Sequence, residues 1–143
     1  MTTSVVPAKL HDVWFVVPAS AVQEILGALR WVPIVGAPTE MPGVIAWRGR
    51  AVAVLDLGPL SGSAALTAGE SRPRTVIVHV DDATLALPVE SVREVQEVPE
   101  TAVRPAHLTR LRHSSMEVEL NGVPMPLIDL ADLLRVLAPP TAA

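Results

Sequence analysis

The chain has 143 residues, of which 50% are hydrophobic and 18% are charged, so it can bury the core of one ordinary domain or of two very small ones. This balance excludes disorder throughout the chain. The formal net charge of −4 argues against a duplex nucleic-acid partner, and the lack of cysteine excludes disulfides, thiolate nucleophiles and cysteine-ligated metals. The N-terminus lacks a signal-peptide pattern and no apolar run approaches the roughly 20 residues of a membrane span, so we expect a soluble cytoplasmic protein.

The N-terminal part predicts a β-hairpin with strands at residues 5–8 and 11–17 and a turn near Lys9 and Leu10. Pro18 ends the second strand, and a one-turn polar segment follows it. The 14 prolines of the chain and its aromatic content of only 3% favour short aliphatic strands over long helices.

The next elements are an extended run over residues 25–34 and a hairpin over residues 44–54. Residues 61–74 are mostly small and polar, and they predict a mobile linker between two halves of the chain.

The two halves repeat each other. Three markers recur at a spacing of 70 residues, namely the pairs Pro18 and Pro88, Val22 and Val92, and Glu24 and Glu94. A second block, residues 49–57, aligns with residues 122–130 at a spacing of 73. Two collinear matches with a small shift predict an internal duplication of units at about 5–60 and 75–137.

The second half begins with a predicted hairpin whose strands are residues 75–80 and 83–89 and whose turn is Asp81 and Asp82. An extended run over residues 95–103 follows it, as in the first half.

The clearest hairpin covers residues 116–128 and turns at Asn121 and Gly122, a pair that suits type I′ geometry. Pro124 and Pro126 would leave the hydrogen-bond ladder of the return strand incomplete, so we expect this strand at a sheet edge.

One helix is predicted at the C-terminus. Asp129 can cap it, and Pro139 and Pro140 end it. Its apolar residues recur at helical spacing: Leu130, Leu133, Leu134 and Leu137. The residues alone therefore predict two small β units of about five, nearly all antiparallel, strands each.

No catalytic constellation is visible. The four histidines, His11, His79, His107 and His113, have no metal-ligand spacing and are expected on the surface. Asp56 and Asp129 could form an acid–base pair, but their equivalent positions in the repeats favour paired helix caps. The basic run 104–113, with Arg110 and Arg112, could contact an acidic partner, although a solvated face is the better interpretation. The residues predict a protein-binding module without a metal or cofactor.

The segment 43–57, Gly-Val-Ile-Ala-Trp-Arg-Gly-Arg-Ala-Val-Ala-Val-Leu-Asp-Leu, resembles the pattern Gly-Val-x-Asn-Leu-Arg-Gly-x-x-x-Pro-Val-x-Asp-Leu of the CheW-like domain of bacterial chemotaxis coupling proteins. Residues 21–26 and 32–38 and the second half of the chain follow the family's blocks in order. The resemblance covers about residues 5–137 and also implies the internal duplication.

This resemblance implies an all-β fold, in which two five-stranded, SH3-like β-barrels interleave within one domain, with short helices and a C-terminal helix. It implies a non-enzymatic, cytoplasmic adaptor that couples the tip of a methyl-accepting chemoreceptor to the regulatory domain of a chemotaxis histidine kinase. Other CheW-like proteins are further potential partners. The alternative from another class is a β-barrel module that binds a small ligand or a peptide.

The resemblance also assigns two surfaces. Receptor-binding residues would be Val22, Glu24, Gly43, Arg48 and Gly49. Glu24 and Arg48 would form an ion pair for orientation, or else a plain surface pair.

The kinase-facing residues would be Trp31, Ile34, Pro38 and Trp47, although Trp31 could equally belong to the core. Trp47 departs from the family, which has Leu before the Arg. The chain also has Ala46 for Asn, Ala53 for the Pro of the return strand, and Met116 and Glu117 for the Gly-Val of the second copy. These departures motivate the hypothesis that the chain keeps receptor binding and engages the kinase weakly or not at all.

Overall fold

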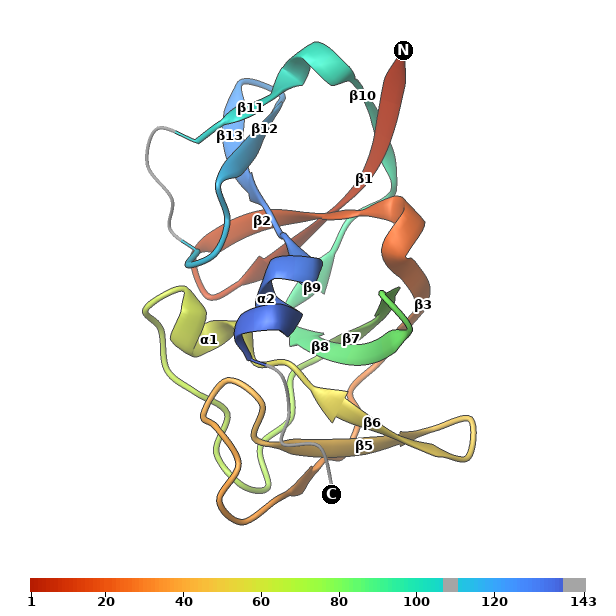
Figure 1. Ribbon diagram of the computed structural model, residues 1–143, viewed down its shortest axis with the longest axis vertical. Helices are drawn as coiled ribbons and strands as arrows, with labels where there is room; N and C mark the ends of the chain where they lie inside the picture. Colours follow the sequence, from red (N-terminus) through yellow and green to blue (C-terminus); the bar gives the residue numbers. More distant parts are fainter. Residues whose placement is uncertain (107–110, 138–143) are drawn as a thin grey trace.

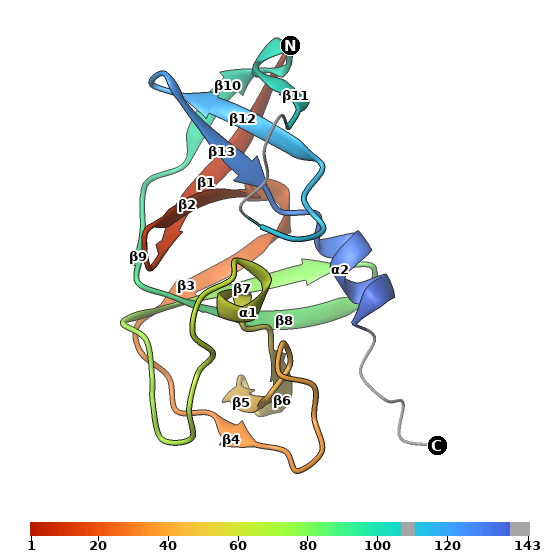
Figure 2. The ribbon, with the colours of Figure 1, turned by 90° about the vertical axis from the view of Figure 1, so that its left-hand side faces the viewer.

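The computed structural model describes residues 1–106 and 111–137. Within these residues the chain forms two β-sheets, one above the other, with two short α-helices at the level between them in both views (Figures 1 and 2). We call them the terminal sheet, which holds the strands nearest both ends of the chain, and the central sheet. The two sheets confirm the predicted all-β class. They have seven and six strands, where about five each were predicted, because segments of only two or three residues also pair.

The terminal sheet has the order β10-β1-β2-β13-β12-β11, and β9 also pairs with β1. Its strands are β1 (Thr2–Leu10), β2 (Val13–Pro18), β9 (Ser91–Val92), β10 (Gln96–Pro99), β11 (Val103–Pro105), β12 (Met116–Leu120) and β13 (Val123–Leu127). The central sheet has the order β3-β7-β8-β6-β5-β4. Its strands are β3 (Val22–Leu26), β4 (Val32–Pro33), β5 (Gly43–Trp47), β6 (Arg50–Val54), β7 (Arg74–Val80) and β8 (Ala83–Val89). The helical elements are η1 (Ala19–Ala21), α1 (Leu57–Leu60), η2 (Glu100–Ala102) and α2 (Leu130–Val136).

Each sheet takes strands from both repeats. The first hairpin of one half joins the later strands of the other half, so the two strand orders are equivalent. The single parallel contact of the terminal sheet joins Val16 to Leu127, and its counterpart in the central sheet joins Ala86 to Val54. Neither half therefore completes a sheet by itself.

The largest core cluster lies between the sheets. It contains Phe15 of β2 and Leu87 of β8, and α2 contributes Leu130 and Leu133 to it. Smaller aliphatic clusters fill the terminal sheet, around Val16 and Met125, and the central sheet, around Ile45 and Ile77. Burial of these branched side chains provides the main stabilisation, as the low aromatic content predicted.

Two local predictions are wrong. The first turn lies at His11 and Asp12 rather than at Lys9 and Leu10, because Leu10 is buried in the core and pairs with Val13 at the end of β1. The extended runs 25–34 and 95–103 are also interrupted.

The return strand β13 is not at an edge, because it lies between β12 and β2. Its pairing with β2 is limited to Leu127, which lies beyond Pro124 and Pro126. The two prolines therefore remove no hydrogen bond to β2, and an interior position tolerates them.

Two hairpins turn where the sequence predicts. Asn121 and Gly122 both have positive φ, at 51° and 79°, as a type I′ turn requires. Asp81 and Asp82 also have positive φ. The predicted helix cap is confirmed, because the Asp129 carboxylate accepts a hydrogen bond from the N–H of Asp132 at the start of α2. Pro139 and Pro140, predicted to end this helix, lie outside the described residues.

The linker carries several anchoring contacts. Leu66 is buried, and its N–H donates to Asp56 at the start of α1. The Trp31 indole donates to the carbonyl oxygen of Glu70 at 2.6 Å. No helix in the described residues is long and apolar enough to cross a membrane.

Candidate functional site

A charged cluster lies where β3 meets the tip of the β5–β6 hairpin. A β-bulge interrupts the pairing of β3 with β7 between Val22 and Glu24, and such bulges redirect side chains. Arg48 occupies the hairpin turn with φ 49°, followed by Gly49 with φ 74°. Arg48 Nη2 lies 2.9 Å from Glu24 Oε1, so the predicted ion pair forms.

Trp47 completes this cluster. Its indole Nε1 donates to Glu24 Oε1 at 3.3 Å, and the Arg48 guanidinium lies over its ring, 4.9 Å from the centroid. The structure therefore brings Trp47, which we assigned to the kinase-facing set, together with two residues of the receptor-binding set. We call Glu24, Trp47, Arg48 and Arg50 the tip cluster.

Two other residues of the predicted receptor set have structural roles. Val22 is half-buried and packs against the core between the sheets. Gly43 is buried at the position where β5 pairs antiparallel with β4. A Cβ atom added at Gly43 would collide with the Val32 carbonyl oxygen and lie 2.8 Å from Cε3 of Trp31. Only glycine permits this close approach of the two strands.

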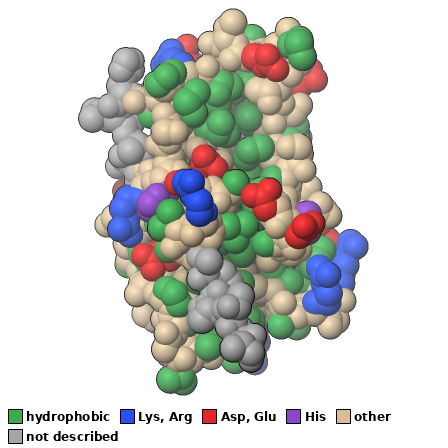
Figure 3. Space-filling view, in the orientation of Figure 1, with side chains coloured by type: hydrophobic (Ala, Val, Ile, Leu, Met, Phe, Trp, Pro, Cys, Tyr) green, Lys and Arg blue, Asp and Glu red, His purple; other side chains and the backbone are tan. Residues whose placement is uncertain are grey.

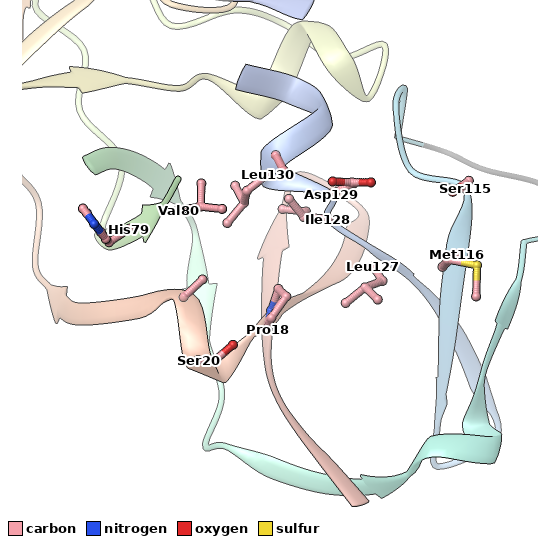
Figure 4. Close-up of a pocket in the computed structure, with 12 residues that line it drawn as sticks. Pro18, Ser20, His79, Val80, Ser115, Met116, Leu127, Ile128, Asp129 and Leu130 are labelled. Carbon is pink, nitrogen blue, oxygen red and sulfur yellow. The ribbon is translucent and has the colours of Figure 1, made fainter. Parts of the chain in front are cut away.

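An apolar groove of about 370 Å³ lies between the sheets (Figure 4). It runs from η1 and the end of β7 to the start of α2, and its lining includes Pro18, Ala21, His79, Leu127 and Leu130. Pro18 and Leu127 also line a second hollow of about 360 Å³ among the strands of the terminal sheet, between β1, β11 and β13. Hydrophobic side chains gather in this region in Figure 3.

Strand β3 connects the groove to the tip cluster, because it begins directly after the groove residue Ala21 and carries Glu24. Val22 follows the groove residue Ala21 directly and pairs with Val78, next to the groove residue His79. The sequence marked Pro18 as a strand end and repeat position, Asp129 as a helix cap and Leu130 as an apolar helix residue, and it assigned none of them to a groove. Their common groove depends on how the two sheets pack, which no local pattern encodes.

A second surface lies on the loop after β4. Ile34 is 51% exposed and Val35 is fully exposed, and together with Pro38 they border a hollow of about 230 Å³. Contiguous exposed aliphatic side chains are typical of protein contacts. Trp31 is half-buried against the core of the central sheet and does not line this hollow.

Two arginines of the basic run have acidic partners within the chain. Arg104 donates to Glu117 at 2.9 Å, and this hydrogen bond raises the pKa of the Arg104 guanidinium above its ordinary value. Arg112 lies 3.6 Å from Glu40, while His107 and Arg110 lie outside the described residues.

Two of the described histidines lie near carboxylates, with His113 Nδ1 3.3 Å from Asp132 and His11 Nδ1 3.5 Å from Glu90. The Nε2 atom of His11 is buried without a hydrogen-bond partner among the described residues. No group of three or more acidic or histidine side chains within the described ranges could hold a metal ion. The described residues thus present one charged cluster and several hollows with apolar linings.

Comparison with known proteins identifies a matching family and similar solved structures. The family model of the CheW-like domain matches residues 4–138. The structure is similar to the scaffolding protein TtCheW from Thermoanaerobacter tengcongensis, with a TM-score of 0.78, 20% sequence identity and coverage of 90% of each chain. At that identity the likeness concerns the fold. No curated protein matches the chain.

Proposed function

This chain belongs to the family of CheW-like domains, and we propose that it is a non-enzymatic adaptor that couples the cytoplasmic tip of a chemoreceptor to a histidine kinase. A scaffold role in chemotaxis agrees with both the family and the fold. The observation that carries the proposal is the tip cluster, which contains the expected Glu24–Arg48 pair and is connected to an apolar groove through β3.

The receptor-facing surface would be the groove together with the tip cluster. Apolar grooves bury the nonpolar face of a partner, while charged side chains at the margin select and orient it. The Arg48 side chain is 70% exposed and that of Glu24 is 32% exposed, so a partner can reach both. Their contribution would be to partner choice, because exposed ion pairs contribute only about 0–1 kcal/mol to stability.

The kinase-facing surface would be the loop of Ile34, Val35 and Pro38. Trp31 would stabilise this loop indirectly, because its indole N–H donates to the Glu70 carbonyl oxygen and so holds the linker in place. We retain the hypothesis that the chain binds the receptor tip more tightly than the kinase, because the chain departs from the family pattern at several positions, namely Ala46, Trp47, Ala53, Met116 and Glu117. Other CheW-like proteins are a third potential partner, and the adaptor would act in the cytoplasm.

Calorimetric titration of the full chain with a purified receptor tip, and separately with a kinase regulatory domain, tests the proposal. We expect R48E to abolish receptor binding while circular dichroism stays unchanged, since it reverses the exposed charge. R93E is the matched control, because Arg93 is an exposed arginine that stacks on Trp14 at 4.4 Å in the terminal sheet.

Unchanged receptor affinity in R48E would refute the assignment of Arg48. Equally tight binding of both partners would refute the hypothesis of a weakened kinase interface. Binding of neither partner would refute the adaptor proposal and favour the alternative of a ligand- or peptide-binding module.

A further inference from the structure

Trp47 connects the anion and the cation of the exposed ion pair. Glu24 Oε1 accepts from both the Trp47 indole, at 3.3 Å, and Arg48 Nη2, at 2.9 Å. The guanidinium of Arg48 also lies over the Trp47 ring. One indole therefore contacts both partners of the pair, which a leucine at this position could not do, since it has no N–H and no π face.

The pair needs such support. Arg48 lies in a two-residue turn, and its long side chain is mostly exposed, so holding one orientation costs side-chain entropy. A tryptophan has only two side-chain torsions and loses little entropy when it is ordered. Because the Trp47 ring packs against the core of the central sheet, it can transmit that rigidity to the tip.

Arg50 lies against the same indole. Its guanidinium is 6.0 Å from the ring centroid and the residue is exposed. Among the described residues no carboxylate pairs with it, whereas Arg48 has Glu24. The tip cluster therefore presents Arg48, whose charge is neutralised by Glu24, and Arg50, whose charge is free to pair with a carboxylate of a partner.

We propose that Trp47 is a positioning residue for partner recognition. It holds Glu24 and Arg48 in the orientation that the partner meets, and it presents Arg50 to an acidic side chain of that partner. This inference rests on the proposed function, because the partner in question is the receptor tip. It assigns the specificity of this chain to Trp47 and Arg50.

The positioning role can be tested in the free protein. We would record the indole N–H signals of the three tryptophans in the full chain by NMR and compare wild type with E24Q. We expect the Trp47 signal to shift, because its acceptor loses its charge, while the signals of Trp14 and Trp31 stay in place. Trp31 is a suitable internal reference because its N–H donates to a backbone carbonyl. A Trp47 signal that moves no more than the other two would overturn the positioning role.

Receptor-tip titrations test the recognition role. W47F removes the indole N–H and keeps an aromatic face. We expect it to weaken receptor-tip binding by about threefold to tenfold, the effect of about one net hydrogen bond. W47L removes the N–H and the aromatic face and should weaken receptor-tip binding further. R50Q removes the positive charge of Arg50 and should weaken receptor-tip binding by about threefold to tenfold. W14F is the matched control, because Trp14 also stacks against an arginine but lies in the other sheet. It should change the affinity by less than about twofold, as expected of a residue outside the interface.

Coupling distinguishes positioning from simple contact. If Trp47 orients Arg48, R48Q should cost less affinity in the W47L background than in wild type. Equal costs in the two backgrounds, or wild-type affinity in W47F and W47L, would overturn the inference. Wild-type affinity in R50Q would overturn the contact assigned to Arg50. If the wild-type chain does not bind the receptor tip, the proposed function fails together with the recognition role, while the indole signals still decide the positioning role.

Discussion

Arg72 is buried against Asp56, with its Nη1 atom 2.8 Å from Asp56 Oδ1, and this ion pair fastens the end of the linker to the start of α1. Asp56 also accepts from the backbone N–H groups of Gly58 and Leu66, and Arg72 also donates to the Pro88 carbonyl oxygen. One carboxylate therefore caps a helix, anchors the linker and, through Arg72, connects both to β8. The segment predicted as a mobile connection is therefore anchored to the rest of the structure at Leu66 and Arg72.

Loss of Asp56 should be far more costly than loss of the equivalent helix cap. D56A leaves a buried guanidinium unpaired, and we expect a loss of about 3–5 kcal/mol in the free energy of unfolding. D129A removes an exposed cap and should cost about 0.5–2 kcal/mol. Urea denaturation measures both. Equal losses would contradict the structural role of the Asp56–Arg72 pair.

Gly43 should be required for the fold independently of any partner. The collision of an added Cβ with Val32 predicts that G43A destabilises the chain by about 1–3 kcal/mol, the usual cost of overpacking. G27A is the matched control, since nothing lies within 4 Å of a Cβ at Gly27 and its φ is not positive. Thermal unfolding compares the two variants. A fully stable G43A that loses receptor binding would instead make Gly43 a direct contact residue.

The exposed loop after β4 should matter for binding and not for stability. I34D and V35D place a charge on exposed side chains. We therefore expect the free energy of unfolding of each variant to lie within about 0.5 kcal/mol of the wild-type value. Binding to the kinase regulatory domain, measured by titration, should fall at least about tenfold, as for a residue at an interface centre.

V123D is the matched control for the loop variants, because Val123 is a 48% exposed valine in the terminal sheet. Kinase affinity that falls equally in V123D and V35D would show that added charge, and not the location of the surface, causes the effect.

The interleaved sheets predict that the halves fold only together. We propose to split the chain in the exposed part of the linker, between Ala68 and Gly69, and to purify residues 1–68 and 69–143. Each fragment alone should lack native circular dichroism, because each sheet takes strands from both. Mixing them should restore the native spectrum. A fragment that folds alone would contradict the interleaved architecture.

Patterns that act over a few residues could be predicted well. Asn121 and Gly122 form the expected type I′ turn because both adopt positive φ at low cost, and Asp129 caps α2 because its side chain reaches an N–H three residues away. The Glu24–Arg48 pair was also expected, although only from the resemblance to a family. Trp47 was noticed as a departure, but nothing in the sequence placed its indole against Glu24, since 23 residues separate them.

The sequence by itself determined the aliphatic core, the duplicated strand pattern, two of the hairpin turns and the family, because these depend on composition and on short spacings. Only the tertiary structure decided which strands the repeats exchange, that β13 lies inside its sheet, and that Glu24, Arg48 and Arg50 surround the Trp47 indole. The reason is physical: pairings such as Val16 with Leu127 join residues more than a hundred positions apart. Packing of the complete core selects such pairings, because no local preference distinguishes one aliphatic strand from another.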